Sequence, residues 1–142
     1  MQIRRARRDD AADILDWRND PETRRRSLNS EVVSEADHTR WFEGVLADER
    51  RVLLIGEIDG RKVGMVRLDR LDGGGFEVSI NMNPQARGLG HGKALLELAL
   101  SWKAGPYVAY VKEDNAASLR LFEGLGFRPE ATEGGVRRYV RS

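Results

Sequence analysis

The chain has 142 residues, of which 40% are hydrophobic and 33% charged, and this balance is typical of an ordinary globular protein. A chain of this length has room for one substantial core but not for two, so we predict a single domain over residues 1–142. The sequence contains no cysteine, which excludes disulfides, thiolate metal sites and a cysteine nucleophile, and its net charge of +1 argues against a general nucleic-acid binder.

The start of the chain carries no signal for export or membrane insertion. Residues 1–8 lack the apolar stretch of a signal peptide, and no run in the chain approaches the length that spans a bilayer. We therefore expect a cytoplasmic protein with no membrane partner.

The first segment predicts a strand and then a helix. We place the strand at residues 3–6, and Asp9 or Asp10 is suited to cap a helix that ends at the Asn-Asp-Pro sequence of residues 19–21. Residues 17–26 are polar and rich in arginine, which is typical either of a solvated basic loop or of a binding segment.

The best helical pattern in the chain comes next. Ser34 is a suitable N-cap, and residues 38, 41, 42, 45 and 46 recur at the spacing of one helix face. His38 lies in the first turn of this face. A single histidine in such a place more often packs or caps than catalyses.

The middle of the chain alternates apolar and polar residues in three successive runs. Residues 52–58 and 62–68 are joined by Asp-Gly-Arg at 59–61, which is a hairpin signal. A glycine turn at 72–75 leads into a third strand over 76–82. We predict an antiparallel meander.

A glycine-rich turn follows this third strand and precedes an amphipathic helix. Gly88, Gly90 and Gly92 occupy every second position of the turn. Backbone N–H groups at such a turn can approach an anion closely, and the helix dipole favours negative charge there. The segment therefore predicts a phosphate site, with added positive charge from Arg87 and Lys93.

Two common phosphate-binding motifs are not matched by this turn. A Walker A loop needs a glycine where the chain has Arg87 and a Ser or Thr where it has Ala94. A dinucleotide-binding fingerprint that begins at Gly88 needs a glycine in place of Lys93. The dinucleotide alternative, which predicts that NADH binds, is therefore weak.

The last part of the chain predicts a strand, a helix and a closing hairpin. Residues 107–111 form a buried strand pattern, and residues 115–127 read as a capped helix that ends at Gly126. Residues 127–132 and 136–140 then flank a Gly-Gly turn.

Two of these segments together resemble the GNAT superfamily of N-acetyltransferases. Residues 87–92 match its acyl-CoA pyrophosphate loop, R/Q-x-x-G-x-G/A, and residues 115–127 match its other shared segment, which ends in an L-G-F step. The resemblance implies an α/β (α+β) fold with a mixed, mostly antiparallel sheet of six or seven strands and about four flanking helices. It also implies that the strands at 76–82 and 107–111 splay apart, so that the pantetheine arm of acetyl-CoA fills the gap between them.

The resemblance further implies that acetyl-CoA is the co-substrate and that no metal is needed. Its expected binding residues lie at the end of the 76–82 strand, in the glycine-rich turn and at the start of the second shared segment. They are Met82, Arg87, Gly88, Leu89, Gly90, His91, Gly92, Lys93, Asn115 and Ser118.

Acetyl transfer to an amine requires a neutral nitrogen, a hydrogen-bond donor for the developing oxyanion and an exit for the thiolate. In the family a glutamate around the position of Glu77 often takes the amine proton, so we expect Glu77 to be the general base. The alternative is that Glu77 is a structural carboxylate paired with an arginine. The backbone N–H at or near Met82 is the expected oxyanion donor.

The sequence departs from the family where the leaving thiolate is protonated. Many members carry a tyrosine seven residues after the asparagine, and Phe122 occupies that position here. A phenylalanine cannot donate a proton. Tyr107, Tyr110, Tyr139 or a water could replace the missing acid, and a non-catalytic acyl-CoA sensor stays as an alternative.

A narrower resemblance concerns the acceptor. Residues 17–19 and 38–42 are similar to N-acetyltransferases that act on UDP-linked 4-amino sugars in pseudaminic acid biosynthesis, and also to ribosomal-protein N-terminal acetyltransferases. We predict the amino sugar, because the arginines at 24–26 could meet a nucleotide diphosphate. The expected acceptor-binding residues are Trp17, Arg18, Asn19 and His38. The expected partner is thus a small-molecule amine, and the oligomeric state is left open, with a homodimer among the options.

Overall fold

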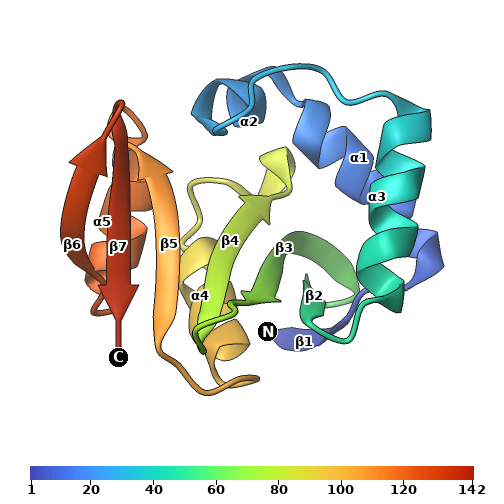
Figure 1. The fold of residues 1–142 in the computed structure, drawn as a ribbon. Helices are drawn as coiled ribbons and strands as arrows, with labels where there is room; N and C mark the ends of the chain where they lie inside the picture. Colours follow the sequence, from blue (N-terminus) through green and yellow to red (C-terminus); the bar gives the residue numbers. More distant parts are fainter.

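The computed structural model describes residues 1–142 and contains one seven-stranded sheet with the spatial order β1-β2-β3-β4-β5-β7-β6 (Figure 1). All neighbouring strands pair antiparallel except β4 and β5, which run parallel. The strands are β1 (Gln2–Arg5), β2 (Arg51–Ile58), β3 (Arg61–Arg70), β4 (Phe76–Met82), β5 (Tyr107–Lys112), β6 (Arg128–Glu133) and β7 (Val136–Arg141). The predicted mixed, mostly antiparallel sheet is confirmed.

Helices cover both faces of this sheet. One face carries the N-terminal helices and the other carries α4 and α5 (Figure 1). The α-helices are α1 (Ala11–Asn19), α2 (Pro21–Arg26), α3 (Glu35–Ala47), α4 (His91–Leu100) and α5 (Ala116–Gly124), and two short 3₁₀ turns are η1 (Arg8–Asp10) and η2 (Pro84–Ala86). No helix combines the length and the apolar character needed to cross a bilayer.

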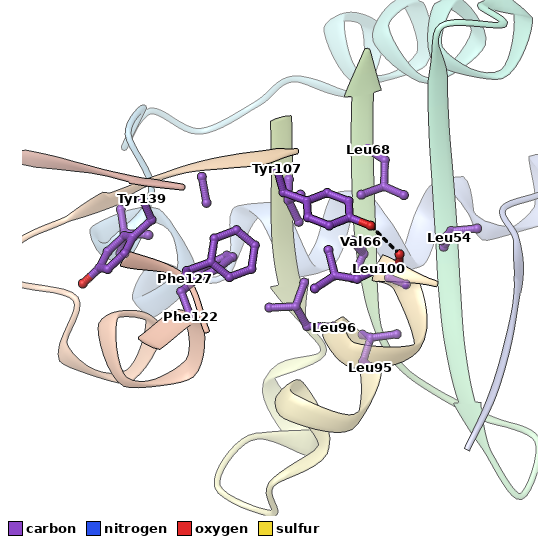
Figure 2. Close-up of a cluster of buried hydrophobic side chains, with 14 of the residues drawn as sticks. Leu54, Val66, Leu68, Leu95, Leu96, Leu100, Tyr107, Phe122, Phe127 and Tyr139 are labelled. Carbon is purple, nitrogen blue, oxygen red and sulfur yellow. Dashed lines mark hydrogen bonds between the residues drawn. The ribbon is translucent and has the colours of Figure 1, made fainter. Parts of the chain in front are cut away.

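Alternation along the strands divides the core into two clusters. On β2, Leu54 packs under α4 in the larger cluster, whereas its neighbours Leu53 and Ile55 pack against α1 and α3 in the smaller one. Figure 2 shows the larger cluster, in which the buried Tyr107 hydroxyl donates a hydrogen bond of 2.8 Å to the carbonyl of Leu100. This bond fixes the start of β5 to the end of α4.

The parallel junction between β4 and β5 is short. Only two residue pairs are in register, Phe76 with Tyr107 and Glu77 with Val108. The strands are held together at this end, where the Phe76 N–H donates to the carbonyl of Pro106 at 2.9 Å. Beyond Glu77 the two strands no longer pair, so the sheet opens into a gap between them.

One helix was not predicted from the sequence. We expected residues 17–26 to contain only the end of a helix and a polar loop, but Pro21–Arg26 forms the separate helix α2. Its start is defined by Asp20, whose side chain accepts a hydrogen bond of 3.1 Å from the Thr23 N–H, and by proline at the first helical position. The six residues carry no apolar periodicity, so only this start signal could have revealed the helix.

Candidate active site

A cleft of about 940 Å³ follows β4 along its open side. Its walls come from α1, α2, the 27–33 segment, α3, β3, β4, the glycine-rich turn, β5 and α5. In Figure 1 this is the region beneath α2, where β4 and β5 diverge. Segments far apart in the sequence therefore meet at the point where the sheet leaves backbone groups unpaired.

The β4 edge of the gap presents free N–H groups. The N–H of Phe76 points toward β5, where it bonds to Pro106, whereas the N–H of Asn83 points toward β3, where it donates to Val63 at 2.9 Å. Because backbone direction alternates along a strand, the N–H groups of Ile80 and Met82 point into the gap. Unpaired backbone groups in a cleft need a hydrogen-bonding partner, which an extended amide-bearing ligand provides.

The glycine-rich turn after β4 has a conformation that side chains disfavour. Gly88 has φ of 76° and Gly90 has φ of 77°, and a Cβ at either position would meet no protein atom within 4 Å. Their backbone therefore faces open space at the first turn of α4, where N–H groups have no helical partner. The turn suits an anion such as a pyrophosphate. Gly92, His91 and Lys93 also line the cleft, but Leu89 does not and is 66% exposed.

Arg87, the first residue of the matched motif, is linked to α2. Its guanidinium donates to the Asp20 carboxylate at 3.0 Å and to the hydroxyl of Thr23. Partial burial raises the pKa of Asp20, but the hydrogen bonds from the Thr23 N–H and from Arg87 outweigh this and hold it below its usual value. The contact therefore connects the glycine-rich turn to α2, which lines the cleft.

Asn115 and Ser118 line the cleft at the start of α5. Asn115 is buried, and its Oδ1 accepts a hydrogen bond of 3.2 Å from the Ser118 N–H, which caps the helix. This bond fixes the amide in a defined orientation beside the gap.

Glu77 lies in β4 and is partly buried in the cleft wall. Its carboxylate makes no salt bridge and no hydrogen bond within the chain, so it is not a structural partner of an arginine. The cross-strand neighbour of Glu77 is Asp69, whose own carboxylate forms a salt bridge with Arg67, with 2.8 Å between Nε and Oδ2. The nearest arginine on this face is thus already engaged, and Glu77 is free to contact a ligand.

Two arginines and a tryptophan lie together in another part of the cleft wall. The guanidinium carbon of Arg18 lies 4.7 Å from the Trp41 ring centroid, and that of Arg67 lies 5.8 Å from the same centroid. Arg18 Nη1 is buried without a hydrogen-bond partner. Burial, with the nearby charge of Arg67, lowers the pKa of Arg18. We call these three residues the arginine pair over Trp41.

Sequence reasoning named Arg18 for this region but missed Arg67 and Trp41. The signal for Arg67 is its place on the strand: it pairs in register with Ser79, so its side chain shares the face of Ser79 and Glu77. That register is set by the folded sheet and cannot be read from the alternation of a single strand.

The other three expected acceptor-binding residues lie outside the cleft. Trp17 is 4% exposed and packs in the smaller core cluster. Asn19 uses its amide to hold Val33, donating to its carbonyl and accepting from its N–H, both at 2.8 Å. His38 is buried and donates through Nε2 to the carbonyl of Ala11 at 2.9 Å. These residues support the cleft wall from behind.

The fold agrees with a comparison against protein families. The model of the acetyltransferase (GNAT) domain family matches residues 1–128. The chain belongs to the GNAT acetyltransferase family. As a member it is an N-acetyltransferase with acetyl-CoA as its acetyl donor. No curated relative matches the sequence.

Solved structures of similar fold include several acetyltransferases. Spermidine N-acetyltransferase from Vibrio cholerae, solved with CoA and spermine, has a TM-score of 0.86 at 18% identity over 99% of this chain and 94% of its own. Ribosomal-protein-alanine N-acetyltransferase from Brucella melitensis has a TM-score of 0.79 at 24% identity over 99% of both chains. The yncA protein from Salmonella typhimurium, solved with acetyl-CoA, has a TM-score of 0.79 at 23% identity over 99% of this chain and 92% of its own. At these identities the likeness is one of fold.

Proposed function

We propose that this GNAT acetyltransferase acetylates the amine of an acceptor that carries a phosphate group, and that the acceptor is a nucleotide-linked amino sugar. The observation that carries this proposal is the arginine pair over Trp41. Two guanidinium groups face the same cleft, and each has a buried nitrogen that makes no hydrogen bond, Nη1 of Arg18 and Nε of Arg67. A phosphate satisfies such groups with charge-assisted hydrogen bonds.

The proposed acetyl-CoA site uses the residues of the glycine-rich turn and of the gap. The N–H groups of residues 88–92 and the dipole of α4 hold the pyrophosphate, with Arg87 and Lys93 adding positive charge. Met82 offers its N–H to the thioester carbonyl, and the capped Asn115 offers its amide to the pantetheine arm, with Ser118 beside it. Acetyl-CoA supplies an activated thioester, and the protein supplies these donors.

Glu77 is the proposed general base. Its carboxylate has no partner in the chain, and it lies on the same face of the sheet as Arg67, on the neighbouring strand. An acceptor whose phosphate binds the arginine pair therefore brings its amine toward Glu77, which takes the proton that the nitrogen loses on attacking the thioester.

The arginine pair also selects against other amines. A polyamine such as spermidine carries several positive charges, and the two guanidinium groups in the cleft repel it, since only Arg67 has a carboxylate partner, Asp69. A peptide N-terminus is not repelled in the same way, but it offers no phosphate to Arg18 and Arg67. We therefore rank peptide acceptors second and polyamines last.

A comparison of three acceptors tests this ranking. CoA release is followed with a UDP-linked 4-amino sugar, an alanine-starting peptide and spermidine. The proposal expects the highest kcat/KM for the amino sugar, and a preference for the peptide would overturn it. Binding of acetyl-CoA without turnover of any amine would instead favour the sensor alternative.

A charge-neutral variant tests the arginine pair directly. Arg67→Gln removes one phosphate contact and should raise the acceptor KM by about 10- to 100-fold, the loss expected for a hydrogen bond to a charged group. Arg61→Gln is the matched control, because Arg61 is exposed at the start of β3 and makes no salt bridge. An acceptor KM that is equal in both variants would contradict the assignment.

A further inference from the structure

Release of the CoA thiolate from a tetrahedral intermediate is faster when an acid protonates the sulfur. Many members of the family carry a tyrosine at the position that Phe122 occupies in this chain. The ring of Phe122 is buried and lies edge-on to Phe127, with centroids 5.0 Å apart, and stacks on Tyr139 (Figure 2). The proton therefore has to come from another side chain or from water.

Two of the three tyrosines are already committed to structural hydrogen bonds. The Tyr107 hydroxyl is buried and donates to the carbonyls of Leu100 and Lys103. The Tyr139 hydroxyl donates to Glu123 at 2.7 Å, and Tyr139 does not line the cleft. Neither hydroxyl can turn toward the gap without breaking these bonds.

Tyr110 is the tyrosine that lines the cleft. It is 42% exposed, and its hydroxyl makes no hydrogen bond within the chain. An exposed aromatic residue on a strand otherwise rich in buried residues is unusual, since Val108, Ala109 and Val111 around it are all buried. Its exposure follows from the opening of the cleft at this point.

The strand register places Tyr110 at the gap. The last paired residues are Glu77 on β4 and Val108 on β5, so Ser79 and Tyr110 lie two residues further along their strands, facing each other across the opening. Because paired residues share a face, the Tyr110 side chain is on the same side of the sheet as Glu77. Base and phenol thus approach the reacting atoms from one side of the gap.

We propose that Tyr110 is the catalytic acid that protonates the leaving sulfur. It takes the role of the tyrosine that many family members carry at the position of Phe122. This inference rests on the proposed acetyl transfer. The amine nitrogen bonds to the thioester carbon, and Glu77 takes the proton that the nitrogen loses. As the carbon–sulfur bond breaks, its electron pair moves to sulfur, and Tyr110 donates its phenolic proton to give the free thiol. The phenolate then regains a proton from the protonated Glu77 by way of water, which restores both residues.

Kinetics of Tyr110→Phe test the assignment. The variant keeps the ring and removes only the hydroxyl, so we expect kcat to fall about 10- to 100-fold. The KM for acetyl-CoA should stay within about twofold, and the loss of kcat at high pH should disappear because no acid remains to be deprotonated. An unchanged kcat would overturn the proposal, as would a variant that keeps the alkaline loss.

A second variant provides a rescue. Phe122→Tyr in the Tyr110→Phe background restores a phenol at the position where the family has one, so kcat should rise again by about tenfold or more. A normal kcat in Tyr110→Phe, with no gain from adding Phe122→Tyr, would show that no phenol is needed. Thermal unfolding of each variant with and without acetyl-CoA checks that folding and cofactor binding are intact.

Titration of bound CoA tests the contact without any acceptor. A phenol that donates a hydrogen bond to sulfur stabilises the thiolate, so the pKa of the bound thiol, followed by thiolate absorbance, should be about one unit lower in the wild type than in Tyr110→Phe. Equal values would overturn the proposal even for a protein whose acceptor is unknown. Absence of CoA binding in both proteins would instead contradict the acetyl-CoA site itself.

Discussion

At the residue scale, the chemistry of the cleft depends on which charged groups have partners. Asp69 is paired with Arg67, and Asp20 is paired with Arg87, so these carboxylates are neutralised by the chain. Glu77 is not paired. A partly buried carboxylate without a partner is costly unless a ligand or water meets it, which is why we assign it the role of base.

Replacement of Glu77 by glutamine removes the base and keeps the shape. We expect turnover at neutral pH to fall about 100-fold, because general base catalysis contributes on this scale. Affinity for acetyl-CoA should change little. Steady-state kinetics and acetyl-CoA binding measure the two effects, with Glu97→Gln on the exposed side of α4 as the charge-matched control. A variant with wild-type rate and wild-type pH profile would show that Glu77 is not the base.

The burial of His38 leads us to expect that the protein is less stable at acid pH. Burial lowers the pKa of His38, the bond to the Ala11 carbonyl opposes this, and the charge of Arg18 lowers it further. The unfolded chain, with a histidine pKa of about 6.5, therefore binds a proton more readily than the folded one. Since stability rises with pH wherever the unfolded state binds more protons, the free energy of unfolding should fall as pH drops from 7.5 to 5.5.

The variant that checks this is His38→Gln, since a glutamine amide can still donate to the Ala11 carbonyl but cannot be protonated in this range. Urea unfolding at pH 7.5 and 5.5 should show a smaller loss of stability for the variant than for the wild type. Equal losses would mean that the drop comes from other groups.

At the element scale, α1 and α2 illustrate what local sequence can and cannot predict. Trp17 and Arg18 are adjacent, but one helical step turns the first into the core and the second into the cleft. We assigned both to the acceptor because residues 17–19 are similar to a segment of other acetyltransferases, and a short polar helix carries too little periodicity to show which of its faces is buried. By contrast, β4, the glycine-rich turn and the start of α5 are encoded by local patterns, and the structure has each of them where predicted. Arg67 lay beyond prediction because its place depends on the pairing of β3 with β4.

The contact between α2 and the glycine-rich turn predicts that removing the charge of Asp20 strengthens acetyl-CoA binding. On our proposal Arg87 adds charge at the pyrophosphate, and Asp20 competes with the phosphates for it. Asp20→Asn keeps the cap of α2, since asparagine caps as well as aspartate, but removes the competing charge. We expect acetyl-CoA to bind about two- to fivefold more tightly, the scale of a partly exposed ion pair.

The control for this prediction is Asp16→Asn, which makes the same charge change at an exposed position of α1. Isothermal titration calorimetry measures the affinity for acetyl-CoA of the wild type, Asp20→Asn and Asp16→Asn. Weaker binding in Asp20→Asn would show that Asp20 serves to position Arg87 and does not compete for it.

At the scale of the whole molecule, the sheet consists of two parts, β1–β4 and β5–β7, that share only two residue pairs. The larger core cluster and α4 hold these parts together on one face. A ligand that bonds to both β4 and β5 adds a direct connection between them. The folded state should therefore gain stability from the cofactor well beyond the contacts at the pyrophosphate.

Thermal unfolding with acetyl-CoA, CoA and NADH, each added separately, measures this gain. A ligand at 100 times its dissociation constant stabilises the folded state by about 2.7 kcal/mol, which for a chain of this size raises the midpoint by roughly 5 to 15 °C. We expect the shift with both CoA species and not with NADH, together with slower hydrogen exchange of the Ile80 and Met82 amides. A shift with NADH alone would favour the dinucleotide alternative.

The divergence of β4 and β5 also bears on how the protein behaves in a crowded cell. A sheet normally has two free edges, but a sheet that parts in the middle has four, and the inner pair carries Ile80 and Met82 on one side and Tyr110 on the other. A free strand edge is a template on which another chain can add a strand. On our proposal acetyl-CoA covers both inner edges, so the metabolite protects the enzyme from self-association, and protein made when acetyl-CoA is scarce is the form most prone to aggregate.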